Sequence, residues 1–409
     1  MPPQTIIILG AGHAGGTAAA LLRQNGFTGS IILIGEEAAV PYHRPPLSKA
    51  YLKGEVDAES LKLRSDTFYH DAGITLRLGA PAVVIDRATK VVVLEGAGVV
   101  AYDTLILATG SRARKLPVPG IRLRNIHELR NLADAEALKA AFEPGRRLLV
   151  IGGGYVGLET AASARTLGAE AVIVEREARC LARVASETVS DFFQTYHRAR
   201  GVEILTGADL ATFRGDAQGF VEAAELGDGR VLHGSVALVG VGGQPCDELA
   251  KAAGLACDGG VVVDLEARTS DPTIFAIGDV TRRPMPLYGG RMFRLESVPN
   301  ALEQAKQATA ALLGLPAPPP EVPWFWSDQY DLKLQIAGVP FEADEILVRG
   351  DPGQAKFALF HLKDRRIQAV EAVNAPPEFM AGRQLIASGR TIDKVKLADP
   401  AVSMKAVAD

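Results

Sequence analysis

The residues with the clearest chemical role belong to a glycine-rich motif that follows a strand-like apolar run. Gly10, Gly12 and Gly15 form a GxGxxG pattern. In this pattern the first glycine permits a tight turn, the second lets the backbone approach a diphosphate, and the third lets a helix pack closely on a strand. The diphosphate then meets the positive N-terminal end of that helix. The motif therefore predicts a dinucleotide-binding site.

A second motif of the same kind, GGGYVG (152–157), lies further along the chain. After each motif the next β-branched run ends in an acid, Glu36 in the first case and Glu175 in the second. A carboxylate at this position accepts hydrogen bonds from ribose hydroxyls and repels a 2′-phosphate. Glu175 therefore predicts NADH rather than NADPH as the second nucleotide. Arg176 beside it could serve a phosphate, so the NADPH alternative stays open.

The elements that must position these motifs are two βαβ units. The first has a strand over Thr5–Leu9, a helix to about Gln24 and a strand over Ser30–Ile34, and the same order returns from Arg147 onward. A repeat of this length favours two doubly wound domains over a solenoid. The expected later elements are strands at 104–107, 273–277 and in LQIAGV, KFALFHL and IQAVEAV, a proline-rich linker at 315–323, and a helix near 380–388.

Composition excludes several classes of protein. The 409 residues include 47% hydrophobic and 22% charged residues, as in an ordinary globular protein of two or three domains. A net charge of −4 gives no reason to expect nucleic acid as a partner. The uncharged stretch Thr5–Leu22 is interrupted by glycines, so we do not expect it to cross a membrane. Cys180, Cys246 and Cys257 form no close pair, which excludes a disulfide framework or thiolate metal site and fits the cytoplasm.

Two dinucleotide sites in one chain imply hydride transfer between a nicotinamide and a flavin. The motif set resembles the FAD-dependent pyridine nucleotide-disulfide oxidoreductases, and within them the putidaredoxin-reductase-like ferredoxin reductases of cytochrome P450 and Rieske oxygenase systems. The blocks that carry this resemblance are GAGHAG (10–15), RPPLSKAYL (44–52), ATG (108–110), GGGYVGLE (152–159), FAIGD (275–279), ESVPNALEQA (296–305) and PWFWSDQYDLKLQIAG (323–338). The last two blocks are specific to the ferredoxin reductase branch.

The resemblance implies a glutathione-reductase-like α/β fold with two doubly wound dinucleotide-binding domains and a small α+β C-terminal domain. The expected boundaries are an FAD-binding domain at 1–115 and 245–320, an NADH-binding domain at 116–244 and the C-terminal domain at 321–409. The residues expected at FAD are Gly10, Gly12, His13, Ala14, Gly15, Glu36, Arg44, Pro45, Lys49, Ala82, Ala108, Thr109, Gly110, Arg130, Asp279, Val298 and Trp326. Those expected at NADH are Gly152, Gly154, Tyr155, Val156, Gly157, Glu159, Glu175 and Gly242.

Lys49 and Glu159 are the expected catalytic pair. The resemblance places both near the flavin N5 and the nicotinamide, where a lysine can stabilise negative charge and a carboxylate can hold the lysine in place. The segment Tyr42–Leu47, where disulfide reductases and peroxidases of this superfamily carry cysteine, reads YHRPPL. Thiol chemistry is therefore excluded there, and electrons must leave from the flavin itself. Cys246, which stands where relatives often carry Asn, is expected to be packed and unreactive.

The expected activity is that of an NADH:ferredoxin oxidoreductase of the EC 1.18.1 type. It converts the electron pair of NADH into single electrons for an acidic [2Fe-2S] ferredoxin, which serves a P450 or Rieske-type oxygenase. Because the chain itself is net negative, docking is expected near Arg64, Arg294 and Lys333. The alternatives are a reductase of rubredoxin or another small acceptor, and a flavin redox sensor like apoptosis-inducing factor.

Overall fold

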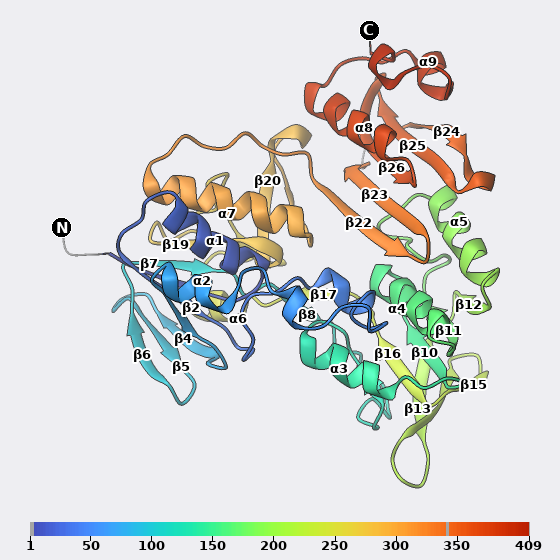
Figure 1. Cartoon of the computed structure of the whole chain (residues 1–409), viewed down its shortest axis with the longest axis horizontal. Coiled ribbons are helices and arrows are strands. Elements are labelled where there is room, and N and C mark those ends of the chain that lie inside the picture. Colours follow the sequence, from blue (N-terminus) through green and yellow to red (C-terminus); the bar gives the residue numbers. More distant parts are fainter. Residues whose placement is uncertain (1–3, 341–342, 409) are drawn as a thin grey trace. The chain divides into compact units, whose positions relative to one another are not determined.

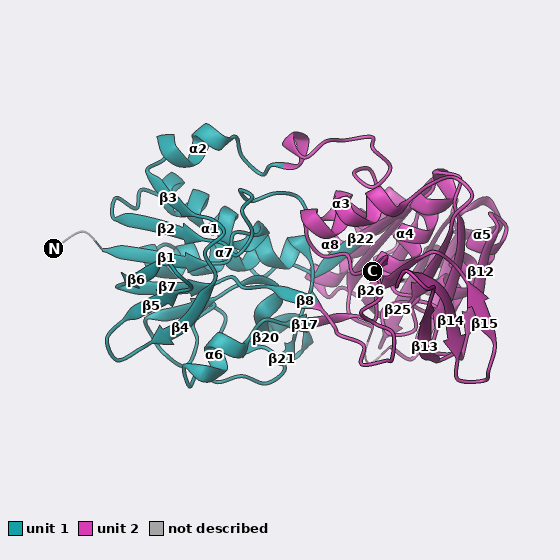
Figure 2. Ribbon diagram, turned by 90° about the horizontal axis from the view of Figure 1, so that it is seen from below, with its two compact units in different colours: residues 1–43, 62–112, 244–325 teal, residues 44–61, 113–243, 326–409 magenta. Residues whose placement is uncertain are grey.

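The computed structural model describes residues 4–340 and 343–408 and divides into two compact units. One unit holds the described residues of 1–43, 62–112 and 244–325, and the other those of 44–61, 113–243 and 326–409 (Figure 2). The chain passes between the units five times, so each unit is built from separate stretches of sequence. The division into three domains with boundaries near 115, 244 and 320 stays a prediction.

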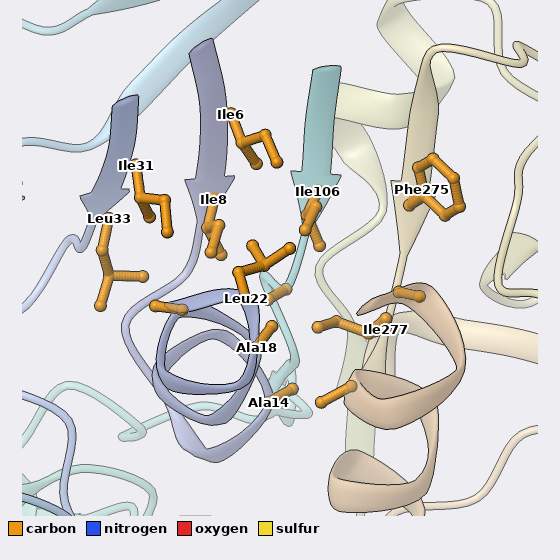
Figure 3. Packing of buried hydrophobic residues seen from close by; sticks show 14 of the residues in the cluster. Ile6, Ile8, Ala14, Ala18, Leu22, Ile31, Leu33, Ile106, Phe275 and Ile277 are labelled. Carbon is orange, nitrogen blue, oxygen red and sulfur yellow. The ribbon is translucent and has the colours of Figure 1, made fainter. Parts of the chain in front are cut away.

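The first unit contains a five-stranded sheet in the order β19-β7-β1-β2-β3, in which all paired strands are parallel. β1 (Thr5–Leu9) and β2 (Ser30–Ile34) have the bounds expected from the sequence, and α1 (His13–Gln24) connects them. The other strands of this sheet are β3 (Ile74–Arg77), β7 (Thr104–Leu107) and β19 (Ile274–Ala276). Figure 3 shows side chains of β1 and β2 packed against side chains of α1: Ile6, Ile8, Ile31 and Leu33 come from the strands, and Ala14, Ala18 and Leu22 from the helix.

The rest of the first unit surrounds that sheet. Its helices α2, α6 and α7 span Asp66–Asp71, Glu248–Ala252 and Val298–Leu313. One three-stranded sheet consists of β4 (Ala82–Asp86), β5 (Val91–Leu94) and β6 (Gly98–Ala101), and another of β18 (Val261–Val262), β20 (Thr281–Met285) and β21 (Arg291–Phe293). A two-stranded sheet contains β8 (Ser111–Ala113) and β17 (Gly243–Pro245), of which Ala113 and Gly243 are counted in the second unit.

The second unit repeats the parallel sheet in the order β12-β11-β10-β16-β9. Its strands are β9 (Ile126–His127), β10 (Arg147–Ile151), β11 (Glu170–Glu175), β12 (Val202–Thr206) and β16 (Val236–Val239). The accompanying helices are α3 (Leu132–Ala141), α4 (Tyr155–Thr166) and α5 (Glu187–Arg198). A three-stranded sheet of β13 (Leu210–Gly215), β14 (Val221–Leu226) and β15 (Val231–His233) covers the core around Leu149 and Val172.

The C-terminal part forms a five-stranded sheet in the order β22-β23-β26-β25-β24, with α8 against β23 and β26 (Figure 1). Its elements are β22 (Trp324–Gln329), β23 (Leu332–Gly338), β24 (Glu345–Asp351), β25 (Lys356–Lys363), β26 (Arg366–Val373), α8 (Pro376–Ser388) and α9 (Lys394–Ala398). β23–β26, β26–β25 and β25–β24 pair antiparallel. Two parallel sheets with a small α+β part confirm the expected fold class.

Candidate functional site

The first glycine turn is closely packed at Gly10 and faces open space at Gly12. Gly10 has φ +116°, and a Cβ there would lie 2.0 Å from the Ala108 carbonyl oxygen. A Cβ on Gly12 would meet nothing within 4 Å, and no side chain caps the helix that begins at His13. The start of α1 therefore presents backbone N–H groups to open space, which suits a diphosphate. The turn fits the expected FAD.

The second turn has the same geometry in the second unit. Gly152 has φ +109°, and a Cβ there would lie 2.4 Å from the Gly240 carbonyl oxygen. Gly154 faces open space, and α4 begins at Tyr155 without a side-chain cap. Both helices start inside their GxGxxG motifs. This turn fits a second dinucleotide.

The two acids expected at ribose hydroxyls lie in different settings. Glu36 is exposed, two residues beyond the last residue of β2. Glu175 is the last residue of β11 and is tied to the second glycine turn, because Gly153 N–H donates to its Oε2 (2.6 Å). Glu177 N–H donates to its Oε1 (2.7 Å). These bonds hold the Glu175 carboxylate beside the glycine turn, and its contact with ribose stays a prediction.

Asp279 lies in the first unit, on the short turn Gly278–Val280 that follows β19. Ser111 Oγ donates to its Oδ2 (3.3 Å), and Gly278 N–H donates to the buried Gln304 of α7 (2.8 Å). Val298 is the first residue of α7, and its contact with FAD stays a prediction. Ala82, Ala108, Thr109 and Gly110 belong to the same unit as the first glycine turn, and their contacts with FAD stay predictions.

Four residues of the second unit form a compact polar cluster around a buried carboxylate. Glu159 is 4% exposed, and its Oε2 accepts from Lys49 Nζ (2.7 Å) and Ser48 Oγ (2.5 Å). Its Oε1 accepts from Ser327 Oγ (2.6 Å), which belongs to the C-terminal sheet. The structure thus brings together the expected pair, Lys49 and Glu159, which lie 110 residues apart in the sequence.

Two of the four cluster residues, Ser48 and Ser327, were not expected from the sequence. Ser327 and Gln329 are both buried on β22, whereas Asp328 between them is only half-buried. Two polar residues on the inward face of a strand are unusual, because side chains on that face are normally apolar. The sequence gives no sign of this alternation, because three consecutive polar residues, Ser-Asp-Gln, occupy positions 327–329.

Other expected residues lie near the cluster or the second glycine turn. Arg44 donates to the Arg130 carbonyl oxygen (2.7 Å), and Pro45 begins the short helix that ends at Ser48. Burial, with the nearby Glu371 and Glu159, holds the pKa of Tyr155 well above its ordinary value. Val156 is 40% exposed and Gly242 has φ +108°, while Trp326 is half-buried. Trp326 has not been tested as a flavin contact and stays a prediction.

The histidine in the first glycine turn, His13, is buried, and its expected contact with FAD stays a prediction. His13 is 8% exposed, and its Nε2 lies 3.3 Å from His43 Nδ1. Burial, together with the nearby Arg64 guanidinium, lowers the pKa of His43, so a neutral ring is favoured there.

The cysteines do not form a thiol centre. Burial raises the pKa of Cys180 to about 12, and its sulfur would lie 2.6 Å from a Cβ on Gly153. Cys246 is half-buried, and Arg112 Nη1 lies 3.8 Å from its sulfur. Within residues 4–340 and 343–408, no group of three His, Cys, Asp or Glu side chains could hold a metal ion. In the same described part, no helix combines the length and hydropathy that a membrane crossing requires.

The three basic residues expected at the docking face differ in charge environment. Arg64 is exposed and its guanidinium lies 5.7 Å from the centre of the Phe68 ring. Arg294 forms an ion pair with Glu296, and Lys333 Nζ lies 3.7 Å from Asp328 Oδ1. A neighbouring carboxylate therefore weakens the positive electrostatic potential around Arg294 and Lys333, two of these three residues.

Comparisons with known proteins agree with this geometry. Residues 4–305 match the family model described as pyridine nucleotide-disulphide oxidoreductase, and residues 324–408 match the reductase C-terminal model. The chain is 54% identical over 405 residues to the probable ferredoxin reductase CtmF of Castellaniella defragrans, with 99% of each chain covered. It is 41% identical over 406 residues to putidaredoxin reductase CamA of Pseudomonas putida, with 98% of this chain and 96% of the relative covered.

A solved structure of the covalent putidaredoxin reductase–putidaredoxin complex contains a chain with the same fold. It matches with a TM-score of 0.96 and 40% identity, covering 98% of this chain and 97% of that chain.

Proposed function

Because the chain belongs to the pyridine nucleotide-disulphide oxidoreductase family, in its ferredoxin reductase branch, we propose that it oxidises NADH and reduces a [2Fe-2S] ferredoxin one electron at a time. The family and the branch confirm what the sequence motifs predicted. The chain is an oxidoreductase of the EC 1.18.1 type, and its cofactors are FAD and NAD(H).

The observation that carries the proposal is the Lys49–Glu159 pair, together with the absence of sulfur in Tyr42–Leu47. A disulfide reductase needs two thiols beside its flavin, and the residue types here supply a held ammonium instead. The Lys49 side chain is only 17% exposed, so solvent screens its charge weakly. When bound, FAD supplies the chemistry that takes two electrons from NADH and releases them singly. The chain's part is to bind the two nucleotides and to hold a positive charge at the reacting end.

The two glycine turns divide the binding between the nucleotides. We assign FAD to the turn at Gly10–Gly15, with Asp279 and Val298 as further contacts, and NADH to the turn at Gly152–Gly157. Glu175, tied to the second turn by Gly153 N–H, then selects NADH because a 2′-phosphate would meet a carboxylate. The names of two relatives pair ferredoxin with NAD(P)(+) in one case and with NAD(+) in the other, which supports a nicotinamide nucleotide as the second substrate.

For the acceptor we propose an acidic [2Fe-2S] ferredoxin that serves a P450 or Rieske-type oxygenase. Putidaredoxin reductase and the ferredoxin reductase component of a biphenyl dioxygenase system are among the relatives, at 41% and 38% identity. Arg64, Arg294 and Lys333 are the proposed docking residues, and the cytoplasm is the proposed compartment.

Acceptor competition tests the proposal against its alternatives. We expect purified protein to reduce a [2Fe-2S] ferredoxin with NADH far faster than it reduces rubredoxin, at equal acceptor concentrations. Faster turnover with rubredoxin would favour the rubredoxin reductase alternative. Slow NADH oxidation with every protein acceptor, accompanied by a change in oligomeric state on reduction, would favour a redox sensor and overturn the proposal.

A further inference from the structure

Within the second unit, a continuous chain of hydrogen bonds leads from the Lys49–Glu159 pair to helix α5. Ser327 Oγ lies 2.6 Å from Glu159 Oε1, and Gln329 Nε2 lies 3.1 Å from Ser327 Oγ. Gln329 Oε1 then lies 2.8 Å from His197 Nε2, which belongs to α5. We call His197, Gln329, Ser327 and Glu159 the hydrogen-bond chain. The expected function of the protein assigns no role to three of these four residues.

Each hydrogen bond in this chain is donated in the direction of the Glu159 carboxylate. An ionised Glu159 only accepts, so the Ser327 hydroxyl donates to it. Ser327 Oγ then accepts from the Gln329 amide, and the Gln329 carbonyl oxygen accepts from a protonated Nε2 of His197. Burial lowers the pKa of His197 to about 4, so the ring is neutral near pH 7 and carries its proton on Nε2. In that tautomer Nδ1 carries no proton and could only accept, and it has no hydrogen-bond partner among the described residues.

The chain lies in the protein interior. Ser327 and His197 are 0% exposed, Gln329 is 1% exposed and Glu159 is 4% exposed. Hydrogen bonds that align head to tail in such surroundings polarise and strengthen one another. A buried polar chain of this kind stabilises one arrangement of its members, and here that arrangement ends on the carboxylate that holds Lys49.

The two oxygens of Glu159 are not held in the same way. Oε2 accepts from Lys49 and Ser48, whereas the described bond to Oε1 comes from Ser327. Without that bond the carboxylate can turn about its last torsion, which is soft. The carboxylate that holds the Lys49 ammonium would then no longer have one fixed orientation.

We propose that Ser327 and Gln329 are positioning residues, which fix the Glu159 carboxylate so that Lys49 is held at the reacting end of the site. Ser327 acts directly on Glu159, and Gln329 acts by orienting the Ser327 hydroxyl. The inference rests on the proposed role of Lys49 and Glu159 in the reaction with NADH, and it adds the C-terminal strand β22 to the parts of the chain that the reaction requires.

The test is stopped-flow reduction of the FAD-loaded protein by NADH, without ferredoxin. Ser327→Ala is expected to lower the limiting rate about 10-fold, because hydrogen bonds to charged groups carry that order of stabilisation. The NADH dissociation constant is expected to change less than about twofold, since the glycine turn is intact. Ser327→Thr keeps the hydroxyl and should retain a rate close to that of the unaltered protein. Ser190→Ala is the matched control, because Ser190 is also a fully buried serine and donates instead to the Cys180 carbonyl oxygen.

A double variant with Lys49→Met distinguishes a positioning role of Ser327 from a general effect of the substitution on the fold. If Ser327 acts through the pair, Ser327→Ala should change the rate less than about twofold in a Lys49→Met background. An infrared difference spectrum of the resting protein gives a readout other than activity. The carboxylate stretching band should shift in Ser327→Ala and Gln329→Leu, and that shift should vanish when Glu159 is replaced by Gln.

An equal loss of rate in both backgrounds, a slow Ser327→Thr variant or an unchanged carboxylate band would each overturn the inference. Because ferredoxin takes no part in this experiment, its outcome is separate from that of the proposed function. A protein that reduces its flavin from NADH but not a ferredoxin would contradict the proposed acceptor and leave this inference standing.

Discussion

Lys49 Nζ and Glu159 Oε2 lie 2.7 Å apart, within one unit of the structure, although 110 residues separate them in the sequence. The pair joins the segment after Pro45-Pro46 to the first turns of α4, the helix that begins at the second glycine turn. The lysine that we propose as catalytic is thereby fixed with respect to the turn that we assign to NADH.

Replacing Lys49 by Met is therefore expected to slow reduction of the flavin by NADH by roughly 10- to 100-fold, because it removes a held charge from the reacting end. FAD affinity should change little, since the proposed diphosphate site is the turn at Gly10–Gly15. Stopped-flow absorbance measures the rate, and FAD fluorescence on dilution measures the affinity. Lys53→Met is the matched control, because Lys53 lies in the same segment and pairs with Glu55 at 2.8 Å. Equal rates for the two variants would remove Lys49 from the reaction.

Glu175 is expected to set the preference for NADH. Replacing Glu175 by Ala removes the sugar contact and the repulsion of a 2′-phosphate, so the ratio of kcat/KM for NADH over NADPH should fall roughly 10- to 1000-fold. Glu170→Ala is the control, since Glu170 begins the same strand and is exposed. Steady-state assays with ferricyanide as acceptor measure both ratios. An unchanged ratio in Glu175→Ala would show that another residue, with Arg176 the first to test, makes the choice.

The neutral state of His197 predicts a specific loss of stability in acid. Its pKa is lowered from 6.5 to about 4 in the folded chain, so the unfolded chain binds more protons between these values. The stabilisation is complete above pH 6.5 and is lost as the pH falls toward 4. At about 1.4 kcal/mol per pH unit, this single residue should remove roughly 2 kcal/mol of the free energy of unfolding between pH 7 and pH 5.

Urea denaturation at several pH values measures this effect. The lowered pKa values of His43 and His127 act in the same direction, so the unaltered protein should lose more than the amount due to His197 alone. His197→Gln should make the pH dependence shallower, while His70→Gln, at an exposed histidine, should leave it as it is. A His197→Gln variant with the same pH dependence as the unaltered protein would contradict the assignment of a buried neutral ring.

Docking of ferredoxin is expected to be electrostatic and local. Reduction of ferredoxin should slow as salt is added, because the screening length falls to about 8 Å near physiological ionic strength. Arg294→Glu should lower ferredoxin reduction several-fold and leave reduction of ferricyanide nearly unchanged. Arg230→Glu is the control, since Arg230 also pairs with an acid two residues away. If Arg294→Glu slows both acceptors equally, Arg294 belongs to the fold or the chemistry and not to docking.

The sequence was sufficient for those parts of the site that depend on local pattern. β1 and β2 have the predicted bounds, because a β-branched run beside a glycine turn is a strong local signal. Lys49 and Glu159 could be named from motifs, but the distance between them depends on how remote segments pack.

The hydrogen-bond chain could not be predicted for the same reason. His197 belongs to α5, for which no helix was predicted, and it meets Gln329 across 132 residues of sequence. Its partners are ordinary polar residues whose role appears only when all four are buried together. Periodicity reports which face of an element is apolar, and it does not report which polar side chains meet across elements.

The most direct test of the account is the stoichiometry of electron transfer. Anaerobic protein, with limiting NADH and an excess of oxidised [2Fe-2S] ferredoxin, should give two reduced ferredoxins for each NADH consumed, as followed by the absorbance of the two species. This result is predicted because NADH carries an electron pair and each [2Fe-2S] ferredoxin accepts one electron. Consumption of NADH without any reduction of ferredoxin would contradict the account.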